Sequence, residues 1–146
     1  MSLCICVQFQ DRMIIGSDTA VTYNLVSGEK QRGSLPAQKT YLIDKWAVFL
    51  AGDRAACSAI AHEYDAEKNK SISSFKRILK KHYRLLSGTQ GKADPNKLNA
   101  VMFKMDGNGR TVSHSFSPTN QFNPVTRRGV SEAVYIITGG FRLMRS

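Results

Sequence analysis

A continuous apolar run from Trp46 to Ala51 is the feature that most constrains how this chain folds. The run has the length of one strand and is apolar on both of its faces, so a strand formed here needs cover on both sides. Gly52 and Asp53 follow at once, and Asp53 is a good N-cap for a helix. We therefore predict a strand packed on both faces that is followed directly by a helix.

Further strands are predicted where polar and apolar residues alternate between turn sequences. They comprise residues 3–9, 12–17, 39–43, 99–105, 111–116 and 133–137. Asp106-Gly107-Asn108-Gly109 separates two of these strands and is a strong hairpin signal. Residues 118–128 are predicted to form a loop.

Two helices are predicted between the fourth strand and the hairpin. The first begins after Asp53 and has an apolar stripe of Ala56, Ile60 and Tyr64. The second runs from about Ser73 to Leu86, with a core-facing side and a basic side. The core-facing residues are Phe75, Ile78, Leu79, Tyr83 and Leu86, and the basic ones are Lys76, Arg77, Lys80, Lys81 and Arg84. Because strands and helices come in blocks without βαβ alternation, we predict a segregated α+β fold.

Length and composition indicate one domain over residues 1–146. The net charge of +10 raises binding to nucleic acid or an acidic partner as an alternative function. No apolar run approaches the ~20 residues of a transmembrane helix, and the alternating start differs from a secretory signal. Cys4, Cys6 and Cys57 form no metal-binding motif with the histidines, so they are expected to be buried thiols. We expect a cytoplasmic protein without a metal, a cofactor or a membrane contact.

The first residues of the chain carry the candidate chemistry. Removal of Met1 would leave Ser2 with a free α-amine at the start of a strand. A hydroxyl and an amine on one residue can act as nucleophile and base. Ser2 is therefore the candidate nucleophile of a hydrolase.

This order of elements resembles the proteasome-type N-terminal-nucleophile hydrolases, with proteasome β-subunits and the bacterial HslV peptidase as the nearest match. The resemblance is carried by Ser2, by Ile15-Gly16-Ser17-Asp18, by Gln38-Lys39-Thr40 and by Leu50-Ala51-Gly52. It implies that Ser2 is the nucleophile, that Lys39 favours the neutral amine and the alkoxide, that Asp18 holds Lys39, and that the Gly52 N–H binds the oxyanion.

The resemblance also implies a fold and a set of partners. The fold would be an αββα sandwich, with the second helical layer largely missing because the C-terminal part of the family's domain is absent. The activity would be proteolysis of peptides or proteins in a homo-oligomeric ring, with an ATPase partner left open. Ile137-Thr138-Gly139-Gly140 departs from the family's glycine-serine-glycine turn. The chain is thus either a fragment or an inactive relative that acts in ring assembly.

The main rival is a non-catalytic module that binds nucleic acid through its basic helix. Against it, Phe75 and Tyr83 fall on the apolar side of that helix and do not alternate with the charges. A charge run of this kind is usually a solvated face. Nucleic acid is therefore the less favoured partner.

Overall fold

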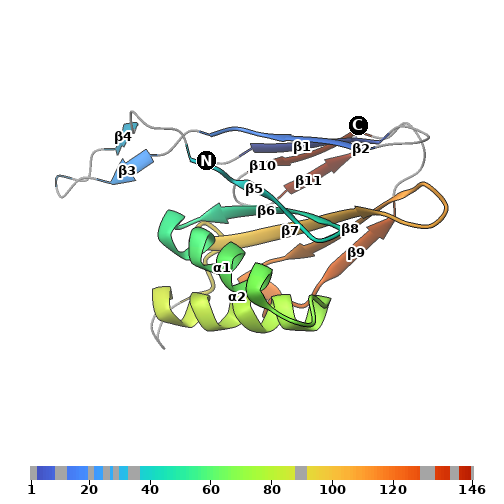
Figure 1. Ribbon diagram of the computed structural model, residues 1–146. Coiled ribbons are helices and arrows are strands. Elements are labelled where there is room, and N and C mark those ends of the chain that lie inside the picture. Colours follow the sequence, from blue (N-terminus) through green and yellow to red (C-terminus); the bar gives the residue numbers. More distant parts are fainter. Residues whose placement is uncertain are drawn as a thin grey trace.

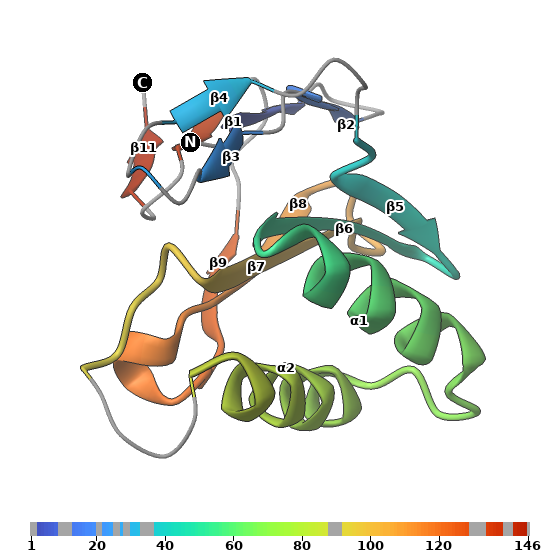
Figure 2. The same ribbon diagram turned by 90° about the vertical axis from the view of Figure 1, so that its left-hand side faces the viewer.

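The computed structural model describes residues 3–8, 13–19, 22–24, 27, 30–32, 37–87, 92–128, 134–138 and 142–145. Two antiparallel sheets stack on each other, and two helices cover the far face of the larger sheet (Figure 1). Figure 2, turned by a quarter, shows the same three layers from the side. The predicted α+β class is confirmed.

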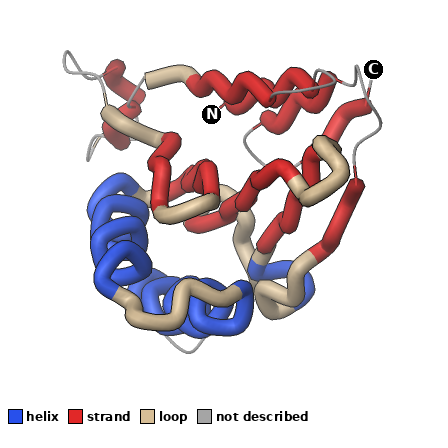
Figure 3. The backbone as a smooth tube through the Cα atoms, turned by 45° about the vertical axis from the view of Figure 1, so that its right-hand side comes forward, coloured by secondary structure: helices blue, strands red, loops and turns tan. Residues whose placement is uncertain are grey.

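The larger sheet has the strand order β5-β6-β7-β8-β9. Its strands are β5 (Thr40–Ile43), β6 (Trp46–Gly52), β7 (Leu98–Met105), β8 (Thr111–Phe116) and β9 (Val125–Arg128). A short 3-10 helix, η1 (Pro118–Asn120), precedes β9. The helices are α1 (Arg54–Ala66) and α2 (Ile72–Ser87). Both lie on the same side of this sheet, as Figure 3 shows in blue.

The smaller sheet has the order β11-β10-β1-β2. Its strands are β11 (Arg142–Arg145), β10 (Val134–Thr138), β1 (Leu3–Gln8) and β2 (Met13–Ser17). Strands β3 (Thr22–Asn24) and β4 (Lys30–Arg32) form a separate hairpin beside it (Figure 1).

Strand β6 is packed on both faces, as its composition predicts. Trp46, Val48 and Leu50 belong to the core between the larger sheet and the helices. Ala47, Phe49 and Ala51 belong to the core between the two sheets. A strand with two buried faces explains why the molecule has a layer on each side of it.

The helices are joined to the larger sheet by caps and by aromatic packing. The Asp53 side chain accepts a hydrogen bond from the Ala56 N–H at 2.9 Å, so the predicted N-cap of α1 is confirmed. Phe75 of α2 lies in the core between Tyr64 and Phe116, with edge-to-face ring contacts at 4.9 and 5.1 Å. These three rings connect both helices to β8.

The core between the sheets is filled by small residues on β1. Cys4 and Cys6 are fully buried and pack with Phe49 and Phe103 from the larger sheet. Side chains alternate along a strand, so Leu3 and Ile5 lie on the outer face, where they are 36% and 37% exposed. Ile14 of β2 is also exposed, and within the described residues no helix covers this face.

Three parts of the chain differ from the sequence-based expectation. The predicted loop over 118–128 was wrong, because it contains η1 and β9. All four side chains of β9 are exposed, so the strand shows no alternation of buried and exposed residues that a sequence pattern could reveal. Its backbone pairs with that of β8. Strands β3, β4 and β11 were also missed. The expected turn at 10–12 and residue Ser2 lie outside the described residues.

Thiol labelling tests the burial of the cysteines. Burial raises the pKa of Cys4 and Cys6 to about 12 and that of Cys57 to about 11. The thiolate is the reactive form, so a disulfide reagent at about pH 8 should label the native protein only as fast as it unfolds. All three thiols should react at once in guanidinium chloride. Rapid labelling of any of them in the native state would contradict this packing.

Candidate functional site

A buried ion pair joins the end of β2 to the start of β5. Asp18 follows the last residue of β2, and Lys39 precedes β5. The Lys39 Nζ lies 2.7 Å from the Asp18 Oδ2. Lys39 is 2% exposed and the Asp18 side chain 27%. An ammonium group with so little access to water needs a charged partner. Asp18, whose side chain is more exposed to solvent, is that partner.

The same carboxylate also holds the first strand. Asp18 Oδ1 accepts a hydrogen bond from the Leu3 N–H at 2.7 Å, and the Asp18 N–H donates to the Leu3 carbonyl at 3.0 Å. The Leu3 nitrogen belongs to the peptide bond with Ser2. The structure therefore brings Asp18 and Lys39 together beside the residue that follows Ser2, while Ser2 itself lies outside the described residues.

A second bond lies next to the ion pair. The Thr40 hydroxyl donates to the Ser17 hydroxyl oxygen at 2.9 Å. Residues 17 and 18 are thus linked to residues 40 and 39, one pair after the other. Sequence reasoning missed this hydroxyl pair. The only available signal in the sequence was that each charged residue has a hydroxyl residue as its neighbour, Ser17 beside Asp18 and Thr40 beside Lys39.

Gly52 ends β6 in a conformation that suits only glycine. Its φ is +120°, and a Cβ at this position would lie 2.2 Å from the Lys97 carbonyl oxygen. Two residues earlier, the Leu50 N–H donates to the Lys39 carbonyl at 2.9 Å. The Lys39 backbone therefore lies beside the end of β6, close in the chain to Gly52.

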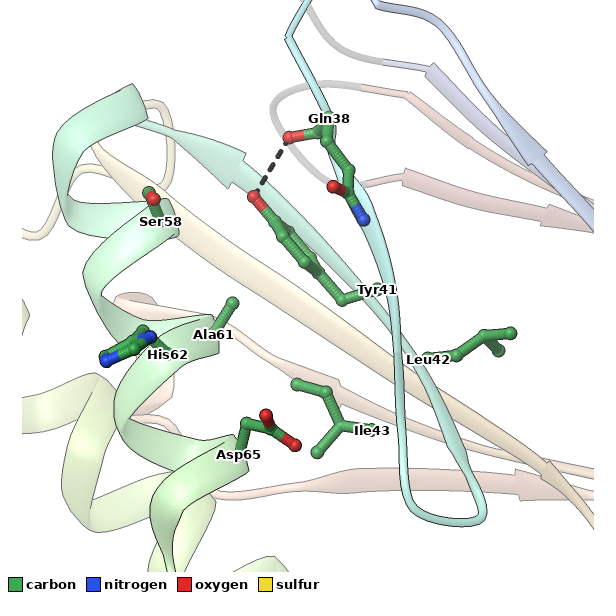
Figure 4. Close-up of a pocket in the computed structure, with 8 residues that line it drawn as sticks. All are labelled: Gln38, Tyr41, Leu42, Ile43, Ser58, Ala61, His62 and Asp65. Carbon is green, nitrogen blue, oxygen red and sulfur yellow. Dashed lines mark hydrogen bonds between the residues drawn. The ribbon is translucent and has the colours of Figure 1, made fainter.

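An open pocket lies between β5 and α1 (Figure 4). Its volume is ≈ 280 Å³. Its lining residues are Gln38, Tyr41, Leu42, Ile43, Ser58, Ala61, His62 and Asp65. The Tyr41 hydroxyl donates to the Gln38 carbonyl at 3.1 Å, and burial raises the pKa of Tyr41. Gln38 is the residue before Lys39, so the pocket and the ion pair involve neighbouring residues of the chain. No motif in the sequence marks this pocket.

The basic side of α2 is partly neutralised by acidic neighbours. Arg77 lies 3.1 Å from Glu67, and Lys81 lies 2.9 Å from Glu63. Glu63 also contacts His82, and hydrogen bonds from His82 and Lys81 lower the pKa of this carboxyl. The aromatic residues of α2 point to the core: Phe75 is fully buried. Little of this surface offers the stacking rings that single-stranded nucleic acid uses.

The described part of the chain holds neither a metal-binding cluster nor a membrane-spanning helix. Among those residues, no group of three or more His, Cys, Asp or Glu side chains could hold a metal ion. No helix among them is long and apolar enough to cross a membrane.

The fold and the site define an α+β protein of two stacked sheets, with helices on one side and a lysine–carboxylate pair against its first strand. No protein-family model and no curated protein match the chain. Solved structures of Anbu (ancestral beta-subunit) are similar in fold. The structure from Yersinia bercovieri has a TM-score of 0.63 at 12% identity and covers 93% of this chain and 60% of that one.

Two further Anbu structures agree. The helical assembly of the Anbu complex from Pseudomonas aeruginosa has a TM-score of 0.58 at 10% identity, with coverage of 93% and 60%. Anbu from Hyphomicrobium sp. strain MC1 has a TM-score of 0.56 at 12% identity, with the same coverage. The chain thus spans 60% of the length of these structures, and the likeness, at such low identity, shows a fold shared with Anbu and nothing more.

These structures correct the sequence-based assignment. The nearest match expected from the sequence was to proteasome β-subunits and the HslV peptidase, and this was wrong: the solved structures compared above are of Anbu. The motifs behind that assignment are three or four residues long. Short motifs in a shared order indicate a common fold, but they do not separate its branches.

Removing the carboxylate should destabilise the protein more than removing the ammonium. Asp18→Asn leaves the buried Lys39 charge without a partner, which should lower the free energy of unfolding by about 3 kcal/mol. Lys39→Met leaves a carboxylate that water can reach, and should cost about 1 kcal/mol. Urea unfolding of both variants gives the comparison. An equal or reversed order would contradict the burial of Lys39.

The backbone at Gly52 can be tested by adding one methyl group. Gly52→Ala should lower the free energy of unfolding by about 3 kcal/mol, because the φ is strained and the Cβ meets backbone. Gly16→Ala is the matched control, since a Cβ there meets nothing within 4 Å; it should change stability by less than about 0.5 kcal/mol. Thermal or urea unfolding would show whether the two differ.

Proposed function

We propose that this chain is an amide hydrolase that uses Ser2, after loss of Met1, as an N-terminal nucleophile to cleave peptides. The domain over residues 1–146 is then an N-terminal-nucleophile sandwich. The helices and the two stacked sheets supply an αββ stack, and the full family pattern is αββα. The similarity to Anbu structures supports the fold part of this proposal.

One observation carries the proposal: the Asp18 carboxylate binds both the Leu3 N–H and the Lys39 Nζ at 2.7 Å. This brings a buried ammonium group to within one residue of Ser2. A cation at that place favours the neutral α-amine and the alkoxide of Ser2. A lysine that served only as a surface charge would not be 2% exposed.

The chemistry proposed for Ser2 needs no added group. Its hydroxyl oxygen attacks the substrate carbonyl carbon, and the hydroxyl proton passes to the α-amine, directly or through water. The reference pKa of an α-amine, about 7.7–8.0, leaves part of it neutral at physiological pH. Collapse of the tetrahedral species breaks the C–N bond, and the leaving amine takes the proton. Water then hydrolyses the Ser2 ester and restores the hydroxyl.

Gly52 is proposed to stabilise the oxyanion through its backbone N–H. The absence of a side chain lets a substrate approach this end of β6 closely. The pocket beside Gln38, at ≈ 280 Å³, is below the ~300–1,000 Å³ typical of small-molecule sites. We assign it to one side chain of a bound peptide.

The proposal extends to assembly. A similar solved structure is a helical assembly of the Anbu complex, which supports a homo-oligomer for this chain, and a ring is the form we propose. The cytoplasmic location and an ATPase partner stay predictions from the sequence. Nucleic-acid binding is less favoured, because two of the cations of α2, Arg77 and Lys81, pair with Glu67 and Glu63.

Ser2→Ala tests the nucleophile. Intact mass should show that the purified protein lacks Met1, and a fluorogenic peptide panel should reveal cleavage. Ser2→Ala should lower kcat by at least about a thousandfold, because the nucleophile is lost. Ser73→Ala, an exposed serine at the start of α2, is the control and should leave kcat unchanged. Full activity of Ser2→Ala, or of a protein that keeps Met1, would disprove the mechanism.

A further inference from the structure

Arg54 occupies a fixed place directly after Gly52 and Asp53. It is the first residue of α1, whose start is held by the Asp53 cap. The Asp53 N–H also donates to the carbonyl of Lys97, the residue before β7, at 3.0 Å, which ties the helix start to that segment. The Arg54 side chain therefore extends from a backbone that is anchored on both sides.

The Arg54 guanidinium turns back toward the sheet and reaches three backbone carbonyls. Nη2 donates to the Leu50 carbonyl at 3.1 Å, Nη1 to the Gln38 carbonyl at 3.4 Å, and Nε to the Gly52 carbonyl at 3.4 Å. Nη2 also lies 3.3 Å from the Cys57 Sγ. The planar fork of an arginine can serve several acceptors at once, and a lysine cannot copy this geometry.

These acceptors lie around the candidate site. The Gln38 carbonyl belongs to the peptide bond that precedes Lys39. The Leu50 N–H holds the next carbonyl, that of Lys39, at 2.9 Å. Arg54 thus connects the segment that carries Lys39 with the end of β6 that carries Gly52.

We propose that Arg54 is a positioning residue that holds the Lys39 segment and Gly52 in their relative places. On the far side of Lys39, the bond between Thr40 and Ser17 fixes the same segment against β2. Lys39 is thereby held through its two chain neighbours, by Arg54 at residue 38 and by Ser17 at residue 40. The catalytic part of this inference rests on the proposed function, whereas the backbone part stands on the contacts alone.

Arg54→Met tests both parts, with Arg77→Met as the control, because Arg77 is an exposed arginine of α2 paired with Glu67. The first readout is amide hydrogen exchange in the full chain without substrate. Arg54→Met should speed exchange of the Leu50 amide by about tenfold relative to the amides of β7. Arg77→Met should leave that ratio unchanged. The positioning role would be overturned if Arg54→Met left the ratio of the Leu50 exchange rate to the β7 exchange rates unchanged. An equal rise in exchange at Leu50 and across β7 counts as such a result.

The second readout is steady-state cleavage of the fluorogenic peptide. Arg54→Met should lower kcat by about tenfold, because a small displacement of a catalytic group costs rate, and KM should stay within about twofold. Arg54→Lys keeps the charge but loses the fork, so it should not restore kcat. Full rescue by lysine, or a rise in KM with kcat unchanged, would overturn the proposal in favour of a charge or substrate contact. If wild type cleaves no peptide, the proposed function fails, and the exchange ratio still decides the role of Arg54.

Discussion

The arrangement of β1, β2 and β5 around the candidate site depends on one joint, meaning the two contacts of the Asp18 carboxylate. One oxygen binds the Leu3 N–H and the other binds the Lys39 Nζ, so a single side chain holds β1, the end of β2 and the start of β5. The first two belong to the smaller sheet and the third to the larger one. Because Lys39 is buried, its charge makes this joint obligatory: leaving the ammonium unpaired would cost several kcal/mol, about 3–5.

Strand β6 explains why the joint lies where it does. Its two apolar faces need cover from the helices and from the smaller sheet, so β1 and β2 must lie over it. Where β6 ends, the chain turns into α1 through Gly52, which has no room for a side chain. The candidate site thus forms at the edge where the two sheets, the turn and the start of the helix meet. The packing of apolar residues brings polar groups together that are far apart in the sequence.

Much of this framework could be predicted from residue patterns. The β6 run, the Asp53 cap, the stripe of α2 and the hairpin at 106–109 each rest on a local rule that the surrounding fold does not oppose. β9 could not be found this way, because its four exposed residues show no period. Its backbone pairs with β8, Thr126 contacts His114 and Arg128 contacts Asp106, and no local pattern in the sequence indicates these partners. The role of Arg54 was equally invisible: its acceptors are carbonyl groups, which every residue has. The short motifs around Asp18 and Lys39, of four and three residues, predicted the pair but did not separate Anbu from other proteins of similar fold.

The choice of a lysine at residue 39 is not explained by folding. A buried ion pair is weak support for stability, since apolar residues of similar size often do as well or better. Asp18 would still hold Leu3 through its other oxygen if residue 39 were methionine. What methionine could not supply is a positive charge beside the start of β1. The cost of burying the Lys39 ammonium is therefore best understood through the chemistry proposed for Ser2, whose amine and alkoxide both respond to a cation at that place.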